Sequence, residues 1–333
     1  MYRLLEPEEG KVLARFQNFY PTSFHEKVSK SSYMDKFYEK AVSVSGITNI
    51  INESEKPVTI VDIAGGRGRF KDAVEKVAEK KFNYVVVDLS REQLGKFEDL
   101  RMRDKEKKGE RFKVVGDMSS VPISGADAAV LLNTPNVILG FYSDFVEKYI
   151  SKYKEFFQKK YDGLFEEEVS KKVLERLRES EEGRISILLG AMMTSVDKLH
   201  ILEAVKLLKE NGVLIIGGFA QAISAYPIDE MKGIPLKVRD VEEFRLNRNV
   251  MKLWRDYSGD DLENNTFFVA SFTKTGEVAG DLIEGCEKIF KDSFHELLKS
   301  KRFWEVLNEL EKIEKEKKEA ADEIHKVAKV IKE

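Results

Sequence analysis

Cysteine, histidine and proline are scarce in this sequence, and each shortage excludes a class of protein. The single cysteine, Cys286, cannot form an internal disulfide and cannot supply a Cys-cluster zinc or iron–sulfur site. Only four histidines occur among 333 residues, so we expect no metal site built on histidine. With seven prolines and 21 glycines, the chain is neither collagen-like nor of low complexity.

Charge of one sign and long apolar segments are also lacking. The 56 Lys and Arg residues nearly balance the 59 Asp and Glu residues, and the net charge of −3 argues against a generally basic nucleic-acid-binding protein. The N-terminal segment MYRLLEPEEG contains no apolar signal-peptide core, and no apolar run approaches the ~20 residues of a membrane-spanning helix. We therefore expect a cytoplasmic protein without a membrane span, for which nucleic acid is not a favoured partner.

Short apolar runs alternate with helical patterns from residue 58 onward. The first run, Val58–Ile63, is continuous and β-branched, which is typical of a buried parallel strand. The alternation predicts an α/β fold, a doubly wound parallel sheet with helices on both faces, whose ligands bind beyond the carboxyl ends of the strands. Further strands are predicted at residues 84–88, 112–115, 126–132 and 213–216, with weaker ones near 250–255 and 266–273.

Helical segments flank and interrupt this predicted sheet. We expect an N-terminal helical cover over 1–56, the main domain over 57–280 and a C-terminal helical extension over 281–333. An aromatic, Lys/Glu-rich helical insertion at 137–195 is either a lid over a substrate or a small subdomain with an aromatic core. Apolar residues at 303–331 alternate in steps of three and four. This heptad seam could pair in a homo-oligomer or pack on the chain's own helices, and we favour the second.

The turn after the first strand is rich in glycine. It runs from Asp62 to Gly68, and glycines there let the backbone approach a ligand closely. A dinucleotide fingerprint would need a third glycine where this chain has Lys71, which disfavours a nicotinamide-dependent dehydrogenase. Asp88 follows Gly68 by 88 − 68 = 20 residues and ends the second strand. A carboxylate at that place can accept hydrogen bonds from two ribose hydroxyls.

The run VTIVDIAGGRGRF around this turn resembles motif I of class I S-adenosylmethionine (SAM)-dependent methyltransferases. The motif reads Asp/Glu-x-Gly-x-Gly-x-Gly, and Asp62, Gly66 and Gly68 match it. Ala64 stands in place of the first glycine, a variant that resembles the ubiquinone/menaquinone-biosynthesis C-methyltransferase branch. That branch carries Thr and an acidic residue where this chain has arginine, at positions 67 and 69.

Later segments continue the resemblance in the same order. YVVVDLSREQL resembles the second motif, which implies that Asp88 binds the ribose and that Leu89 lies beside the adenine. VGDM resembles the third motif, in which Asp117 would accept from the adenine amino group and Met118 would pack on the ring. Residues 201–216 resemble the helix and turn that precede the fifth strand.

The resemblance implies a seven-stranded Rossmann-like methyltransferase sheet and SAM as the cofactor. Pro135 and Tyr142 follow the fourth strand and are expected near the substrate. No residue is assigned as a general base, because methyl transfer needs one only where the acceptor must lose a proton. The residues implied in cofactor binding are Asp62, Ala64, Gly65, Gly66, Gly68, Asp88, Leu89, Asp117, Met118 and Asn133.

We therefore expect transfer of a methyl group from SAM to a small-molecule or lipid-like acceptor. Two alternatives stay open: an RNA or protein methyltransferase, and a binding or assembly subunit that keeps the fold without transfer activity. The near-neutral charge argues against RNA as the acceptor. Ala64 and the altered loop at Asn133 allow the second alternative, whereas the retained Asp88 and Asp117 argue against it.

Overall fold

The structure of this chain is a computed structural model. It describes residues 4–16, 32–88, 91–95, 97, 109–116, 121–132, 137–150, 175, 178–219, 233–245 and 266–332. By its packing, the chain divides into two compact units. The sheet unit comprises Thr22–Pro135 and Asp197–Gly285 together with Met1, and the helical unit comprises Tyr2–Pro21, Asn136–Val196 and Cys286–Glu333.

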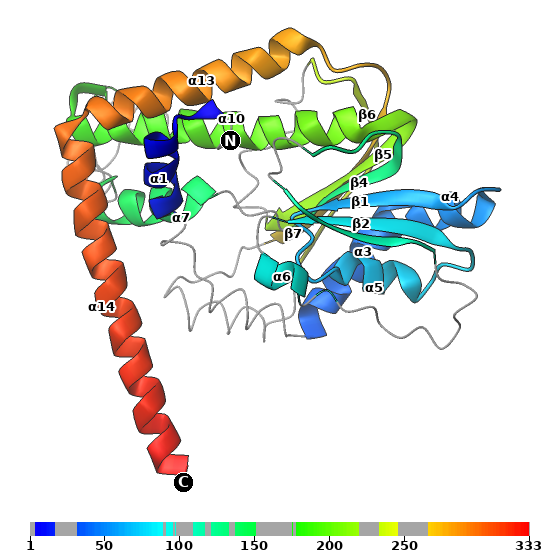
Figure 1. The fold of residues 1–333 in the computed structure, drawn as a ribbon, viewed down its shortest axis with the longest axis horizontal. Helices are drawn as coiled ribbons and strands as arrows, with labels where there is room; N and C mark the ends of the chain where they lie inside the picture. Colours follow the sequence, from blue (N-terminus) through cyan, green and yellow to red (C-terminus); the bar gives the residue numbers. More distant parts are fainter. Residues whose placement is uncertain are drawn as a thin grey trace, which may run out of the picture. The chain divides into compact units, whose positions relative to one another are not determined.

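The sheet unit is built on a single seven-stranded sheet in the order β3-β2-β1-β4-β5-β7-β6 (Figure 1). The pairs from β3 to β5 are parallel, and β7 runs antiparallel to both of its neighbours. The chain order reverses beside β1, which is where doubly wound sheets bind ligands. The expected fold class is thus confirmed. The strands are β1 (Val58–Ile63), β2 (Phe82–Asp88), β3 (Arg111–Val115), β4 (Ala126–Leu132), β5 (Leu208–Phe219), β6 (Leu236–Arg245) and β7 (Thr266–Lys274).

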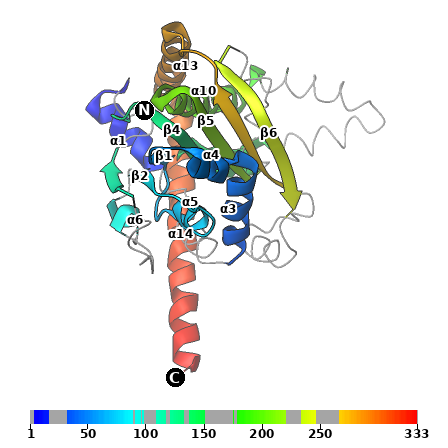
Figure 2. The same cartoon turned by 90° about the vertical axis from the view of Figure 1, so that its right-hand side faces the viewer.

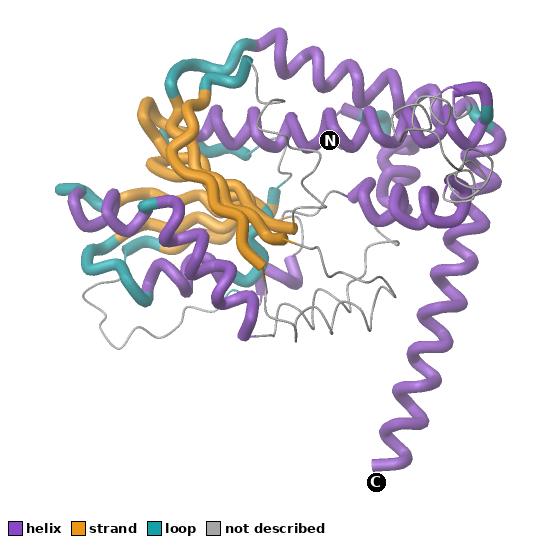
Figure 3. Tube along the Cα trace, turned by 180° about the vertical axis from the view of Figure 1, so that it is seen from behind, coloured by secondary structure: helices purple, strands orange, loops and turns teal. Residues whose placement is uncertain are grey.

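Helices α3, α4 and α5 cover one face of this sheet (Figures 2 and 3). Phe37 of α3 packs against Phe267 of β7, with ring centroids 5.4 Å apart. Ile60 of β1 and Tyr84 of β2, which are partners in the parallel register, belong to the same buried core. Burying such apolar side chains stabilises the sheet by roughly 1.5–3 kcal/mol each. The helices are α3 (Ser32–Ser45), α4 (Ile47–Glu53) and α5 (Arg69–Glu75), and the short α6 (Arg91–Gly95) follows β2.

The opposite face of the sheet is buried as well. Val61, Val85 and Ala129, which alternate with the residues of the first face, are at most 6% exposed. This burial on both faces explains why the strands read as continuous apolar runs rather than as alternating patterns. The second part of α10 (Glu181–Leu207), from Asp197 onward, belongs to the same unit.

Helix α10 is, among the described residues, the one helix long and apolar enough to cross a membrane by length and composition. Its most apolar window has a mean hydropathy of 1.4, and 56% of that window is buried inside the protein. The expectation that nothing in the chain spans a membrane rests on uninterrupted apolar runs, which this test does not use, and it stays a prediction. Uninterrupted apolar runs are short in 181–207, because isolated charged residues divide a helix whose average is apolar. Core helices of soluble proteins have the same composition, so the helix alone does not indicate a membrane.

The helical unit is held together by aromatic and ionic contacts between distant parts of the chain. Phe16 stacks on Phe141 with centroids 4.6 Å apart, and Phe303 meets both rings edge-on at 6.2 and 6.1 Å. Arg15 donates from Nε to Glu311 over 2.8 Å. The early part of the predicted heptad seam thus packs within the chain. The elements are α1 (Pro7–Arg15), α7 (Val137–Phe145), the π-helix η4 (Val146–Ile150), the first part of α10, most of α13 (Gly280–Lys299) and α14 (Lys301–Lys332).

Two expectations about the chain beyond the insertion differ from the structure. The sequence predicts a helix over 196–210 that is capped by Thr194 or Ser195, but α10 is continuous from Glu181 to Leu207. Ser195 instead donates its hydroxyl to the carbonyl of Met192 over 2.8 Å, inside the helix. Strand β6 is not predicted, because it is an edge strand of largely exposed, charged residues. The strand predicted near 250–255 lies outside the described residues.

The predicted N-terminal helical cover is divided between the two compact units. Helices α3 and α4 of the predicted N-terminal cover belong to the sheet unit, whereas α1 belongs to the helical unit. The physical reason is the apolar stripe of α3, which includes Phe37 and Ala41 and is buried in the sheet core. The boundaries at 56/57 and 280/281 stay predictions.

Candidate functional site

The turn between β1 and α5 has an unusual backbone conformation. Ala64, Gly66 and Gly68 adopt positive φ angles of 56°, 51° and 76°. Two hydrogen bonds fix the turn, because Ala64 N donates to the carbonyl of Val87 (2.7 Å) and Gly68 N donates to that of Gly65 (2.8 Å). Glycine adopts such angles without strain, whereas an L-residue does so at a cost of roughly 1–2 kcal/mol. Ala64 therefore carries a strain that the glycine of the resembled motif would not.

Gly65 lies directly over the carboxyl group of Asp62. A Cβ atom at Gly65 would lie 2.3 Å from both Cγ and Oδ2 of Asp62, closer than such atoms can approach. The turn can therefore cover this carboxyl group only with glycine at position 65. As a result, Asp62 is 3% exposed although it lies at the end of a strand.

Burial dominates the acidity of Asp62. Removal from water raises the pKa of its carboxyl from 3.8 to about 7. The hydroxyl of Tyr84, fully buried on β2, donates to Oδ2 of Asp62 and opposes the rise, whereas the charge of Asp88 adds to it. Burial, followed by the same pairing with Asp62, raises the pKa of Tyr84 well above its usual value of 10. Asp62 is thus a carboxyl group that can gain or lose a proton near neutral pH, under the turn where a ligand would lie.

Asp88 links the end of β2 to the turn. Its Oδ2 accepts a hydrogen bond from Gly66 N over 3.1 Å, and its carbonyl accepts from Gly116 N over 3.1 Å. The side chain is half-buried. A carboxylate can accept about four hydrogen bonds, so the bond from Gly66 is compatible with further bonds to a sugar diol. Asp88 and the turn therefore form one hydrogen-bonded unit at the carboxyl ends of β1 and β2.

An aromatic side chain supports the other end of the turn. A Cβ atom at Gly68 would lie 2.4 Å from the ring of Phe97, so this glycine too is required by close packing. Phe97 stacks on Tyr84 at 6.3 Å, and Nζ of the fully buried Lys71 lies 4.5 Å from the Phe97 ring centroid. The sequence prediction missed the roles of Tyr84, Lys71 and Phe97. No sequence signal distinguishes Tyr84, because its bond to Asp62 depends on the strand register, which places it opposite Ile60, two residues before Asp62 on the same strand face.

The structure brings together six of the predicted cofactor residues and leaves the others untested. Tyr142 is half-buried on α7 in the helical unit. The roles of all these residues stay predictions. Those gathered at the turn are Asp62, Ala64, Gly65, Gly66, Gly68 and Asp88. Those outside the described residues are Leu89, Asp117, Met118, Asn133 and Pro135.

Comparisons with known proteins identify no family for the chain. No model of a known family matches it, and no curated protein matches it. Solved structures with a similar arrangement are distant. The 4+2 cyclase SpnF is 11% identical with a TM-score of 0.41, over 74% of this chain and 82% of that one. Magnesium protoporphyrin IX methyltransferase from Synechocystis PCC 6803, solved with bound SAM, is 8% identical with a TM-score of 0.41, over 81% and 98%. A SAM-dependent methyltransferase from Methanosarcina mazei is 14% identical with a TM-score of 0.35, over 69% and 98%.

Proposed function

We propose that this protein is a SAM-dependent methyltransferase that acts on a small-molecule or lipid-like acceptor. The observation that carries the proposal is Asp88, a carboxylate at the end of β2 that is hydrogen-bonded to the glycine turn after β1. This unit lies beside the reversal of strand order, where doubly wound sheets bind nucleotides. The motif resemblance supplies the rest of the support.

The residues present suit the chemical groups of SAM. A carboxylate at position 88 matches a ribose diol, since two hydroxyls can donate to its oxygens in charge-assisted bonds. Asp62, the second carboxyl group at the turn, suits the neighbourhood of the ammonium of the amino-acid tail, and a nearby positive charge would favour its ionised form. Glycine at 65, 66 and 68 leaves the backbone open to close approach.

When bound, SAM supplies a methyl group on a positively charged sulfonium, which a nucleophile of the acceptor can displace. In that reaction the protein would bind SAM and orient it toward the acceptor. Asp88 and the turn would hold the adenosine in one position, and a fixed near-attack geometry accounts for much of the acceleration that such reactions need. Asp62 lies under the turn with Tyr84 as its donor, so its proton affects the shape and charge of the turn rather than the acceptor.

Titration calorimetry with SAM and S-adenosylhomocysteine tests the proposal. We expect dissociation constants in the micromolar range or tighter, about −8 kcal/mol, and no binding of NAD. Asp88→Ala should weaken binding at least about tenfold, since each charge-assisted bond contributes roughly 1.5–3 kcal/mol. Asp88→Asn keeps an acceptor for Gly66 N and separates the effect on the turn from the effect on the ligand.

Glu53→Gln, an exposed carboxylate at the end of α4, is the matched control and should leave affinity unchanged. If wild-type protein bound neither adenosyl compound, the proposed function would be wrong. If both bound and no methyl transfer to candidate acceptors followed, the alternative of a binding subunit would replace it.

A further inference from the structure

A pocket of about 180 Å³ lies between α3, the glycine-rich turn and the exposed side of α5, entirely within the sheet unit. This volume far exceeds the roughly 10–15 Å³ that one water needs, and it is smaller than the roughly 300–1,000 Å³ of sites for whole drug-sized ligands. It suits one functional group of a ligand. Its polar lining consists of Asp35, Tyr38, Arg67, Arg69, Asp72 and Lys76.

The lining carries an excess of positive charge. Three cationic side chains face two carboxylates. Two of the cations have acidic partners, since Arg69 lies 3.5 Å from Asp35 and Lys76 lies 2.8 Å from Glu39. The Asp35 contact holds the Arg69 guanidinium, which is 13% exposed, at the wall of the pocket. The Arg69 guanidinium is therefore fixed in place rather than extended into solvent.

Arg67 is the third cation, and it is differently placed. Among the described residues, the structure contains no hydrogen bond or ion pair of Arg67, although the side chain is half-buried. Burial is the first cause that lowers the pKa of Arg69, and the positive charge of Arg67 is the second. The two guanidinium groups therefore repel each other. The carboxylate of Asp72 in the lining attracts both of them and offsets part of this repulsion. A bound anion would offset the rest and gain two charge-assisted contacts.

We propose that this pocket binds an oxyanion, the phosphate or carboxylate group of a small metabolite, between Arg67 and Arg69. Guanidinium groups present planar donor pairs that match both kinds of oxyanion, and the hydroxyl of Tyr38 adds a further donor to the lining.

The pocket is separate from the site proposed for the adenosyl cofactor. Neither Asp62 nor Asp88 lines it, and the lining continues along α5 to Lys76, two helical turns beyond Gly68. The pocket and the cofactor site share only the turn. The inference consequently does not depend on the proposed function.

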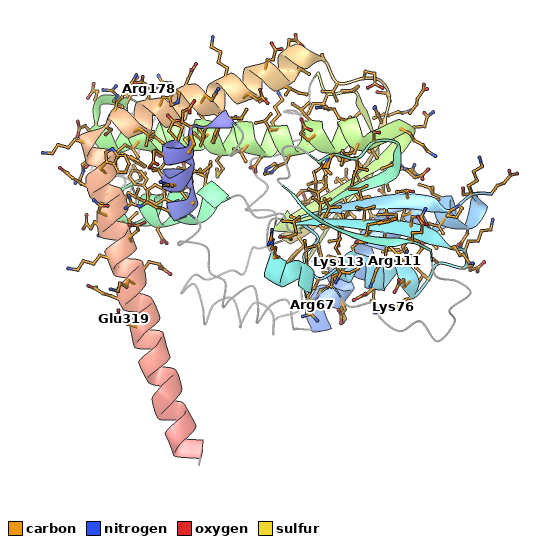
Figure 4. The ribbon with its side chains drawn as sticks, viewed as in Figure 1. Arg67, Lys76, Arg111, Lys113, Arg178 and Glu319 are labelled. Carbon is orange, nitrogen blue, oxygen red and sulfur yellow. The ribbon has the colours of Figure 1, made fainter. Side chains whose placement is uncertain are left out.

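Phosphate and succinate, titrated into the full chain at constant ionic strength, are the probes for the two chemistries. Calorimetry and protein NMR shifts should report binding of at least one of them. Arg67→Gln and Arg69→Gln should each weaken it about tenfold or more, because each removes a charge-assisted contact. Arg178→Gln is the matched control, an exposed arginine of the helical unit that should leave affinity unchanged (Figure 4). Arg67→Lys keeps the charge but loses the planar donor pair, so it should weaken binding less than Arg67→Gln but measurably, and it stands in if a Gln variant misfolds.

Two results would overturn the inference. The first comes from the two probes: the inference fails if wild-type protein binds neither phosphate nor succinate. It fails equally if both Gln variants bind these probes as tightly as wild type does. The second comes from the cofactor itself: if Arg67→Gln weakens S-adenosylhomocysteine but not methylthioadenosine, which lacks the amino-acid tail, Arg67 holds the carboxylate of the cofactor. We expect both adenosyl compounds to bind Arg67→Gln as they bind wild type. Phosphate binding without any adenosyl binding would refute the proposed function and leave this inference in place.

Discussion

The buried carboxyl group of Asp62 should make the stability of the sheet unit depend on pH. Its pKa is raised from 3.8 to about 7, so the folded state binds this proton more tightly than the unfolded chain. The contribution of Asp62 to the free energy of unfolding is greatest below about pH 4 and falls as the pH rises to about 7. At about 1.4 kcal/mol per tenfold change in proton affinity, the difference amounts to at most about 4 kcal/mol.

The variant Asp62→Asn isolates this effect. Asparagine has nearly the same shape, still accepts the hydroxyl of Tyr84, and cannot ionise. Its NH2 group is a hydrogen-bond donor at a place built for a carboxylate, which accepts. Burying this donor without an acceptor costs roughly 1–3 kcal/mol at every pH. Between pH 4 and pH 8, however, the stability of the variant relative to wild type should increase by up to about 4 kcal/mol. In thermal unfolding this is a relative gain in Tm of up to roughly 8–16 °C for a domain of this size class.

Urea unfolding followed by far-UV circular dichroism at four or five pH values between 4 and 8 measures the effect. Asp240→Asn, which makes the same chemical change on the exposed edge strand β6, is the control. Parallel pH profiles of wild type and Asp62→Asn would show that burial does not hold the proton on Asp62, and the reasoning would fail.

Three further substitutions around the turn have expected outcomes. Gly65→Ala should lower the free energy of unfolding by about 1–3 kcal/mol, because its Cβ would lie 2.3 Å from the fixed Asp62 carboxyl; unchanged urea midpoints would mean that Asp62 moves aside. Ala64→Gly should stabilise by up to about 1.5 kcal/mol, since it relieves the strain at φ 56° and costs about 0.4–1 kcal/mol in unfolded-state entropy; a lower Tm would contradict this. Tyr84→Phe should destabilise by roughly 1–3 kcal/mol and move the titration of Asp62, followed by carboxyl carbon NMR, to higher pH; an unmoved titration would show that the hydroxyl does not support the ionised form.

The sequence predicts the centre of the sheet well. Val58–Ile63 and Ala126–Leu132 have the predicted bounds, because strands buried on both faces require uninterrupted apolar residues that end where the turn begins. The glycine turn and the position of Asp88 are likewise predicted, since positive φ angles and close approach restrict the residue type.

Other features depend on contacts between strands and helices that sequence periodicity does not encode. The Tyr84–Asp62 bond depends on the register between β1 and β2, and a tyrosine in an apolar run looks like an ordinary core residue. Helix α10 begins before the predicted bound because Ser195 bonds back to Met192 inside the helix rather than capping its start. The exposed edge strand β6 lacks an apolar pattern because its pairing with β7 and polar contacts, such as the ion pair of Glu242 with Lys40 of α3, hold it in place.

The segmental composition of the helical unit has a consequence for its biosynthesis. Phe16 and Phe141 find their partner Phe303 only after the ribosome has added 303 − 16 = 287 residues beyond the first of them. Translation at roughly 5–20 residues per second takes about 14–57 s to add these residues. During this interval the apolar sides of α1 and α7 are available to chaperones and to other nascent chains. A nonsense mutation between Lys274 and Phe303 would leave these surfaces without Phe303, so such truncated chains should aggregate or be degraded even though every described strand of the sheet has been made.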